Sequence, residues 1–184
     1  MNRAETRKRE TPPARDAATL VVVIPLELVG VRVEIPANTP MVLLRELDER
    51  HRLLPIYIGS PEASAIHYAL EGLEPPRPLT HDLFLTTLHE LGAEISQVVV
   101  TEMRERTYYA ELHLTTADGP KVISSRPSDA IALAVRSGAP LFATDELIDE
   151  VGQEPPPEPE DEAEEIIDEF KDFIENVSPE DFGS

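Results

Sequence analysis

The chain has 184 residues with no cysteine, and its 36 acidic residues against 16 basic ones give a formal net charge of −20. The absence of cysteine excludes disulfide bonds and thiolate metal sites. No apolar run approaches the roughly 20 residues that cross a membrane, and residues 1–20 lack the apolar core of a signal peptide, so we expect a cytoplasmic protein with no membrane partner.

The acidic charge is concentrated at the C-terminal end. Residues 153–184 carry thirteen acidic residues and one lysine, whereas residues 1–20 carry five basic and three acidic ones. An acidic surface repels nucleic acid at long range, because non-specific affinity for DNA and RNA comes from basic surface. The charge therefore counts against a tight nucleic-acid binder. It is compatible with a metal-assisted phosphodiesterase, since a bound cation neutralises an acidic site.

Composition divides the chain into three parts. Residues 1–19 are polar without an apolar period, and we expect a disordered arm there. Residues 20–152 alternate apolar runs with turn signals over a length that suits one domain. Residues 153–184 combine a proline-rich linker with an acidic amphipathic helix, whose apolar stripe consists of Ile166, Phe170, Phe173 and Ile174. An isolated helix of this length is marginal in water, so we expect it to dock on its own domain, on a neighbouring chain or on a protein partner. Its acidic charge would also allow it to cover a groove formed by Arg77 and Arg126.

The first half of the domain predicts three strands followed by two helices. Apolar runs at residues 20–35, 41–47 and 53–58 predict the strands, with a hairpin tip at 48–51. Pro55 places the third strand at an edge or a bulge, because proline cannot donate to a sheet ladder.

Both helices have start signals. Ser60 is the expected cap of the first helix, followed by a proline and then Glu62 in the first turn. Thr80 is the expected N-cap of the second helix, which spans residues 80–91. The expected buried face of this helix consists of Leu83 or Phe84, Leu88 and Leu91.

The second half predicts three strands, a helix, a short strand and a short final helix, at residues 94–103, 108–116, 121–125, 127–137, 140–143 and 145–151. The helix at 127–137 is rich in alanine, so we expect it to be buried along most of its length. The order of the elements is typical of an α+β fold with a mixed, mostly antiparallel sheet packed with three to four helices.

An arginine–proline pair precedes a helix twice in this domain. Arg126 leads the helix in SRPSDAIALAV, and Arg77 leads the helix at 80–91. A helix N-terminus attracts anions, and a guanidinium group binds phosphate with two parallel hydrogen bonds. We therefore expect the two arginines to face one shared groove, within one chain or across a dimer. The structural alternative is an ordinary loop whose first-turn acid, Asp82 or Asp129, serves as a dipole partner.

The candidate catalytic residues all lie at the starts of predicted helices, and they are Glu62, His81, Asp82 and Asp129. An imidazole is suited to general acid–base chemistry or to metal binding, with loop packing as the structural alternative. Two converging carboxylates would hold one Mg²⁺ or Mn²⁺, for which Asp82 and Asp129 are the candidates. The candidate substrate-binding residues are Arg77, Arg126, Thr80 and Ser128.

Several common catalytic motifs are missing. The chain contains no Gly-x-x-x-x-Gly-Lys-Ser/Thr loop, no Gly-x-Gly-x-x-Gly after a strand and no Gly-x-Ser-x-Gly elbow. These absences disfavour P-loop nucleotide hydrolysis, dinucleotide chemistry and serine esterase chemistry. No predicted helix interleaves basic residues with stacking aromatics, which disfavours a dedicated RNA reader.

Three segments together resemble the bifunctional nuclease (BFN) domain family, and in particular its actinobacterial branch. They are MVLLRELDERHRLLPIYIGSPEASAIHYALEG, RPLTHDL and SRPSDAIALAVRSGAPLFA, in that order, and the resemblance covers residues 24–152. The C-terminal FKDFIENVSPEDF is similar to the tail of that branch. The resemblance implies a wedge-like domain that pairs into homodimers, with a groove as the active site. It also implies hydrolysis of phosphodiester bonds in DNA and RNA, but no established set of catalytic residues.

Two functions therefore stay open at the level of sequence. One is a nuclease of the BFN type, which the three motifs favour. The other is a non-catalytic, acidic, dimeric adaptor or regulatory domain that binds a protein, which the net charge of −20 and the acidic tail favour.

Overall fold

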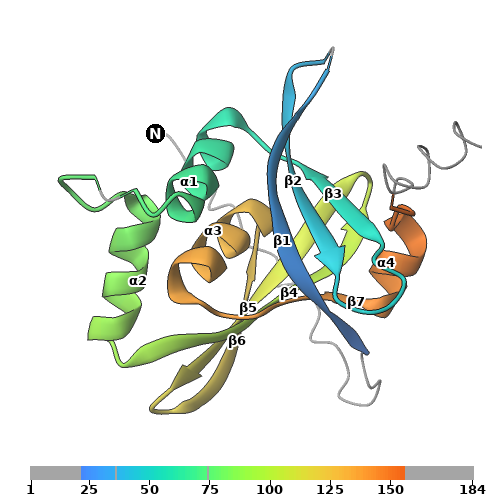
Figure 1. Ribbon diagram of the computed structural model, residues 1–184. Coiled ribbons are helices and arrows are strands. Elements are labelled where there is room, and N and C mark those ends of the chain that lie inside the picture. The colour runs from blue at the N-terminus through green and yellow to red at the C-terminus, as the bar shows by residue number, and fades with distance from the viewer. Residues whose placement is uncertain (1–21, 36, 74, 156–184) are drawn as a thin grey trace, which may run out of the picture.

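The computed structural model describes residues 22–35, 37–73 and 75–155 (Figure 1). The arm expected at residues 1–19 and the acidic helix expected after residue 160 lie outside the described residues. The described part contains one seven-stranded sheet and four helices, which confirms the predicted α+β fold. None of the helices in these ranges is long and apolar enough to cross a membrane.

The seven strands follow the order β3-β2-β1-β7-β4-β5-β6 in the sheet. Their bounds are β1 (Val23–Glu34), β2 (Thr39–Glu46), β3 (Leu53–Tyr57), β4 (Ala93–Arg104), β5 (Thr107–Thr116), β6 (Gly119–Ser125) and β7 (Leu141–Thr144). All neighbours are antiparallel except β4 and β7. The position of β3 at one edge confirms the prediction from Pro55.

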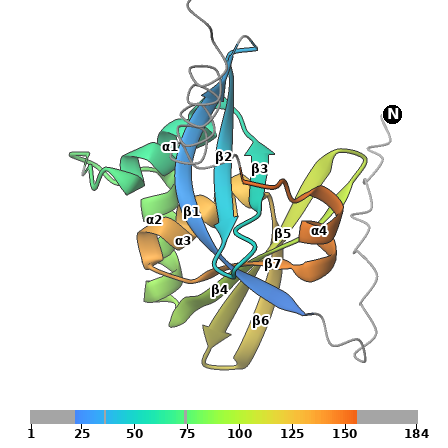
Figure 2. The same ribbon diagram turned by 45° about the vertical axis from the view of Figure 1, so that its right-hand side comes forward.

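The last strand joins the two halves of the sheet. In β7, Leu141 is the register partner of Leu26 in β1 and of Val98 in β4. Two hairpin-connected groups of strands, β1–β3 and β4–β6, therefore meet through a four-residue strand that comes late in the chain (Figure 2).

The four helices are α1 (Ser60–Leu70), α2 (Thr80–Glu90), α3 (Pro127–Ser137) and α4 (Asp145–Val151). Helix α3 packs on β4 and β5 and contacts both α1 and α2 (Figure 1). It is buried from Ala130 to Ala134, which confirms the prediction from its alanines, because small side chains allow the helix to approach the sheet closely. Gly138 ends it with a φ of 73°, a left-handed conformation that glycine adopts without strain.

The start of α1 differs by one residue from the prediction. Gly59, rather than Ser60, is the N-cap, because its extended backbone directs its carbonyl oxygen to the N–H of Ala63 at 2.9 Å. Helix α2 differs in the same way. Its N-cap is Leu79, so the expectation that Thr80 caps the helix is wrong, and the carboxylate of Asp82 accepts the N–H of Leu79 instead at 2.8 Å.

The buried face of α2 is also different from the predicted one. Leu88 packs against the core as expected, but Leu83, Phe84 and Leu91 are 59%, 42% and 75% exposed. The inner face consists of His81, Leu85 and Leu88, which lie at helical spacing. Polar contacts of the first turn with α3, described below, set this rotation, and the wrong residues were expected because hydrophobicity alone does not report such contacts.

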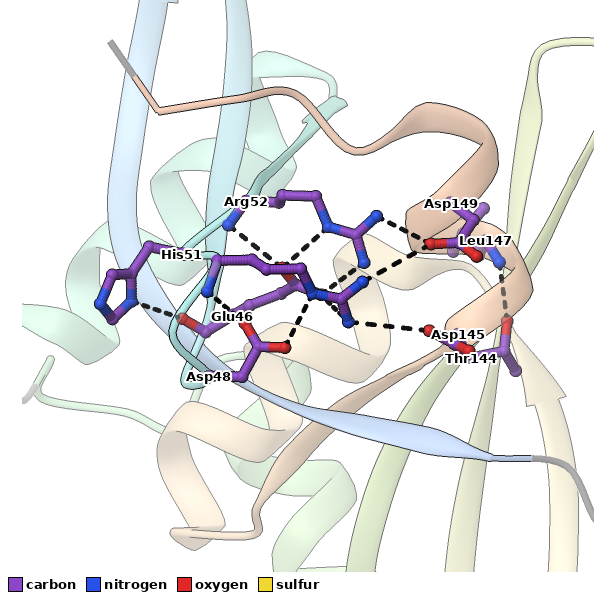
Figure 3. Close-up of polar contacts among 9 residues, drawn as sticks. Glu46, Asp48, His51, Arg52, Thr144, Asp145, Leu147 and Asp149 are labelled. Atoms are coloured by element: carbon purple, nitrogen blue, oxygen red, sulfur yellow. Dashed lines mark hydrogen bonds and ion pairs between the residues drawn. The ribbon is translucent and has the colours of Figure 1, made fainter. Parts of the chain in front are cut away.

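A fully buried carboxylate ties the β2–β3 hairpin to α4 (Figure 3). Glu46 is 0% exposed and accepts hydrogen bonds from Nε and Nη2 of Arg52, each at 2.9 Å, and from the Arg52 backbone N–H at 3.1 Å. The remaining Arg52 nitrogen donates to Asp149 of α4 at 2.8 Å. Gln153 then pairs with Leu53 through two backbone bonds of 2.8 Å, so the chain after α4 lies against the β3 edge.

Candidate active-site groove

A groove of about 390 Å³ opens where four segments meet: the end of β3, the start of α1, the β4–β5 turn and the start of α3. Its lining includes the polar side chains of Tyr57, Glu62, Arg106, Tyr108, Arg126 and Ser128. Together with Thr107, these residues bring two arginines, one carboxylate and four hydroxyl groups to one concave surface, which is the usual form of a small-ligand or catalytic site.

Arg126 is the central cation of this groove. Its Nε and Nη2 donate to the two carboxylate oxygens of Asp129 at 2.7 and 2.9 Å, and its Nη1 donates to Glu62 at 2.9 Å. The hydrogen bonds from Asp129 and Glu62 raise the pKa of Arg126, so the guanidinium stays charged. Its side chain is still 63% exposed, and an incoming anion can therefore reach it.

The carboxylate of Glu62 is folded back over the residue that precedes α1. An added Cβ at Gly59 would lie 2.3 Å from the Oε2 atom of Glu62, so the carboxylate occupies space that any other residue at position 59 would fill. The other oxygen, Oε1, accepts the hydrogen bond from Arg126. Gly59 thus leaves room for the carboxylate of Glu62, whose side chain is only 21% exposed.

Asp129 connects the groove to α2. Its Oδ1 lies 3.5 Å from Nε2 of His81, whose side chain is 17% exposed. Hydrogen bonds from Arg126, and to a lesser extent the proximity of His81, keep the pKa of Asp129 below its ordinary value. His81 is therefore one contact away from Arg126 and does not line the groove.

Asp82 makes a separate contact on the same side of α3. Its Oδ1 accepts Nε of Arg136 at 2.7 Å, and Arg136 also donates to the carbonyl oxygens of Ala132 and Ala65 at 2.9 Å each. Desolvation raises the pKa of Asp82, but the hydrogen bonds from Arg136 and Leu79 outweigh it and leave the pKa below its usual value. Arg136 therefore ties α3 to both α1, through Ala65, and α2, through Asp82.

The two aspartates that the sequence nominated for Mg²⁺ or Mn²⁺ both have arginine partners. Asp129 uses both oxygens on Arg126, and Asp82 uses its oxygens on Arg136 and on the N–H of Leu79. Among the residues that the structure describes, no group of three or more acidic or histidine side chains is arranged to hold a metal ion. A cation at either aspartate would have to displace an arginine, so these residues do not form a ready metal site.

The remaining predicted site residues divide into two groups. Ser128 is 7% exposed and lines the groove, as its candidate role requires. Arg77 and Thr80 are exposed and do not line it. The expectation that Arg77 and Arg126 share a groove is therefore not met within one chain, and their approach across a dimer stays a prediction.

Arg106 and Tyr57 are groove residues that the sequence reasoning missed. Arg106 lies in the two-residue turn between β4 and β5, where it and Glu105 have φ angles of 63° and 50°. Positive φ at both central positions matches the twist of a tight hairpin and directs this tip over the groove. Tyr57 ends β3, and its hydroxyl donates to Glu34 at 3.0 Å. The available signal for Arg106 was its place in the short gap, residues 104–107, between the strands predicted at 94–103 and 108–116.

The lowered pKa of Asp129 predicts a specific dependence of stability on pH. A carboxyl whose folded pKa lies below its ordinary value of 3.8 stabilises the fold above that pH, and the contribution disappears as the pH falls through the folded pKa. We expect wild type to melt at a higher temperature than Asp129→Asn at pH 6, and the difference to shrink below about pH 3.8. Thermal unfolding between pH 6 and pH 2.5 measures this, and a difference that grows on acidification would contradict it.

Comparison with known proteins places this domain in a family. A family model described as the bifunctional nuclease domain matches residues 42–156. Two proteins from strains of Mycobacterium tuberculosis, both named as uncharacterized, are 41% identical over 162 residues, which is 85% of this chain and 96% of theirs. The rice protein named bifunctional nuclease 1 is 28% identical over 103 residues, which is 54% of this chain and 31% of the rice protein. The chain belongs to the bifunctional nuclease domain family.

Proposed function

We propose that this protein is a nuclease that hydrolyses phosphodiester bonds in DNA and RNA, and that the groove at Arg126 is its active site. The observation that carries the proposal is the contact between the Glu62 carboxylate and the Arg126 guanidinium at 2.9 Å, on the wall of an open groove that Arg106 also lines. In phosphodiester hydrolysis a carboxylate can take a proton from the attacking water, and a guanidinium can bind the phosphate. Membership of the family supports the same reaction, since plant relatives are named bifunctional nuclease.

The residues of the groove have distinct roles in this proposal. Arg126 and Arg106 bind the non-bridging oxygens of the phosphate and stabilise the charge that develops on them in the transition state. Glu62 accepts a proton from a water molecule, whose oxygen attacks the phosphorus. The phosphorus–oxygen bond to the leaving sugar then breaks, and that oxygen takes a proton from solvent.

Asp129, His81 and Asp82 act indirectly in this scheme. Asp129 holds two of the three donating nitrogens of Arg126 and so fixes the plane of the guanidinium. His81 supports Asp129 from α2. Asp82 fixes α2 against α3 through Arg136. We therefore assign them as positioning residues.

The test is a cleavage assay on end-labelled DNA and RNA strands with wild type, Glu62→Gln and the matched control Glu27→Gln. Glu27 makes an exposed ion pair with Arg45 on β1 and β2, away from the groove. We expect Glu62→Gln to lose at least about 100-fold in cleavage rate, because a general base contributes on that order, and Glu27→Gln to keep the wild-type rate. Equal rates in all three preparations would indicate a contaminating nuclease and contradict the proposal.

A second candidate function, protein binding, is favoured by the exposed apolar face of α2. Leu83, Phe84 and Leu91 are exposed there, and large apolar side chains gathered on one surface mark interaction sites. We propose that the occupant is a second copy of this chain, as the family resemblance implies. Docking of the acidic tail on another protein stays a prediction, because that segment lies outside the described residues.

Leu83→Glu tests the pairing. Leu83 is 59% exposed in the single chain, so the substitution should change the free energy of unfolding of the monomer by less than about 0.5 kcal/mol. A buried glutamate at an interface would oppose association. We expect light scattering after gel filtration to give a dimer for wild type and a monomer for Leu83→Glu. A wild-type monomer, or a dimer that survives the substitution, would contradict the assignment of this face.

A further inference from the structure

We infer that the groove accepts one unpaired nucleotide and that the protein therefore prefers single-stranded nucleic acid to duplex. This inference rests on the proposed function, because it names the substrate class of the same groove. Three independent features of the groove support it: its size, its aromatic lining and the charge around it.

The groove is too small for a duplex. Its volume of about 390 Å³ lies near the lower end of the range of small-ligand sites, about 300–1,000 Å³, and suits a single nucleotide. Arg126 stands at the open side with 63% of its side chain exposed, whereas Glu62 is 21% exposed and lies deeper. A duplex phosphate would reach Arg126 from outside, but the bases of a duplex stay stacked within it and would not enter the groove. A nucleotide that enters the groove meets both.

Two tyrosines offer surfaces on which a base can stack. Tyr57 is 51% exposed, and the hydrogen bond from its hydroxyl to Glu34 holds the ring in place. Tyr108 lines the same groove and is partly buried, and burial raises the pKa of its hydroxyl, so that group remains a hydrogen-bond donor. Aromatic rings stack on any base, which suits action on DNA and RNA alike, but only a base released from its own helix can reach them.

The net negative charge of the protein also favours single-stranded nucleic acid over duplex. Duplex DNA carries about one negative charge per 1.7 Å of its length, and a single strand carries roughly half of that density. The formal net charge of −20 repels both, and it repels the denser and stiffer duplex more. Affinity must then come from contacts inside the groove, to Arg126, Arg106 and the tyrosines, which the duplex cannot make.

The test compares the binding of one fluorescent 20-nucleotide phosphorothioate DNA strand, alone and annealed to its complement, by anisotropy at about 0.15 M salt. The phosphorothioate backbone slows hydrolysis during the titration. We expect the single strand to bind at least about tenfold tighter than the duplex. Tyr57→Ala should weaken single-strand binding by about tenfold and leave duplex binding unchanged, because stacking on a ring contributes on that order. Tyr57→Phe, which keeps the ring, should bind like wild type.

The outcomes separate this inference from the proposed hydrolysis. Equal affinity for the two probes, or a Tyr57→Ala variant that folds and binds like wild type, would overturn the inference. Cleavage of duplex as fast as single strand would also overturn it and leave the hydrolysis standing. If single strands bind in a way that depends on Tyr57 but are not cleaved, the preference for single-stranded nucleic acid is supported and the proposed hydrolysis is contradicted. Thermal unfolding confirms that each variant is folded.

Discussion

Arg52→Ala is expected to lower the free energy of unfolding by about 3 kcal/mol, the largest loss of stability that we predict for a single substitution. The reason is that the substitution removes the main cation paired with the buried carboxylate of Glu46. Glu46 is 0% exposed, and three of the hydrogen bonds to its carboxylate come from Arg52. Without the Arg52 guanidinium, the buried carboxylate keeps only the longer ion pair with Arg50, whose Nη2 lies 3.7 Å from Oε1 and whose side chain is half exposed. Desolvation of a carboxylate that has lost its hydrogen-bonded cation costs several kcal/mol. Chemical denaturation measures the loss.

Arg45→Ala is the matched control for this prediction. Arg45 lies on β2, next to Glu46, and pairs with Glu27 across the strand, but both side chains are about half exposed. We expect it to cost less than about 1 kcal/mol, because water screens exposed ion pairs. The double variant Glu46→Leu/Arg52→Leu should recover most of the loss, since replacing both members of a buried pair removes the unpaired charge. A loss in Arg52→Ala no greater than that in Arg45→Ala would contradict the account of the pair.

Arg126→Gln is expected to lower kcat/KM for nucleic-acid cleavage by about 1,000-fold while the protein stays folded. Removing one donor to a developing oxyanion costs about 100- to 1,000-fold, and Arg126 also carries the charge that binds the substrate phosphate. Its side chain is 63% exposed and its ion pairs lie at the surface, so the fold should tolerate the change. Steady-state cleavage of a labelled single strand, with thermal unfolding alongside, measures both effects.

Arg77→Gln tests whether the effect is specific to Arg126. Arg77 also precedes a helix and is exposed, but it does not line the groove. We expect it to change cleavage less than about threefold, with Arg45→Gln as the neutral reference. A loss in Arg77→Gln together with a retained rate in Arg126→Gln would move the site to the start of α2 and contradict the assignment.

Much of the fold was predictable because its signals are local. Gly138 after α3 and the prolines in the first turns of α1 and α3 mark helix ends by their backbone preferences, and the apolar runs give the strands within a few residues. The short strand β7 was predicted, but its position was not. Leu141 lies between Leu26 and Val98, and pairing across such distances in the chain leaves no trace in local pattern.

Two features of the structure depend on tertiary contacts that local preference does not report: the buried Glu46 and the inner face of α2. Glu46 lies within the strand predicted at residues 41–47, and nothing in the local pattern indicates that its carboxylate is buried. Arg52, 6 positions further on, satisfies that carboxylate and in turn contacts Asp149 of α4. Helix α2 has apolar residues on more than one side. The contacts of His81 and Asp82 with α3 decide which side faces inward, and Leu83 is left exposed.

The candidate site was predicted only in part, because its residues come together through tertiary contacts. Glu62 and Arg126 were both nominated because each stands at a helix start, and the structure joins them although they are 64 positions apart. Arg106 carried no motif, because a two-residue hairpin turn accepts many residues when its tip is exposed. Arg77 repeated the motif of Arg126 without reaching the groove, so similar sequence around two helix starts did not place them at one site.

The most direct measurement of the central claim is nuclear magnetic resonance of the arginine Nε–H groups during titration with a short single-stranded phosphorothioate oligonucleotide. Phosphate binding at the groove must perturb the donors that bind it, and Arg126 already has its Nε engaged with Asp129 at 2.7 Å. We predict that the signals of Arg126 and Arg106 shift with one common binding curve while that of Arg45 stays in place. Saturable binding that shifts Arg77 or Arg45 and leaves Arg126 unmoved would contradict the claim that this groove is the active site.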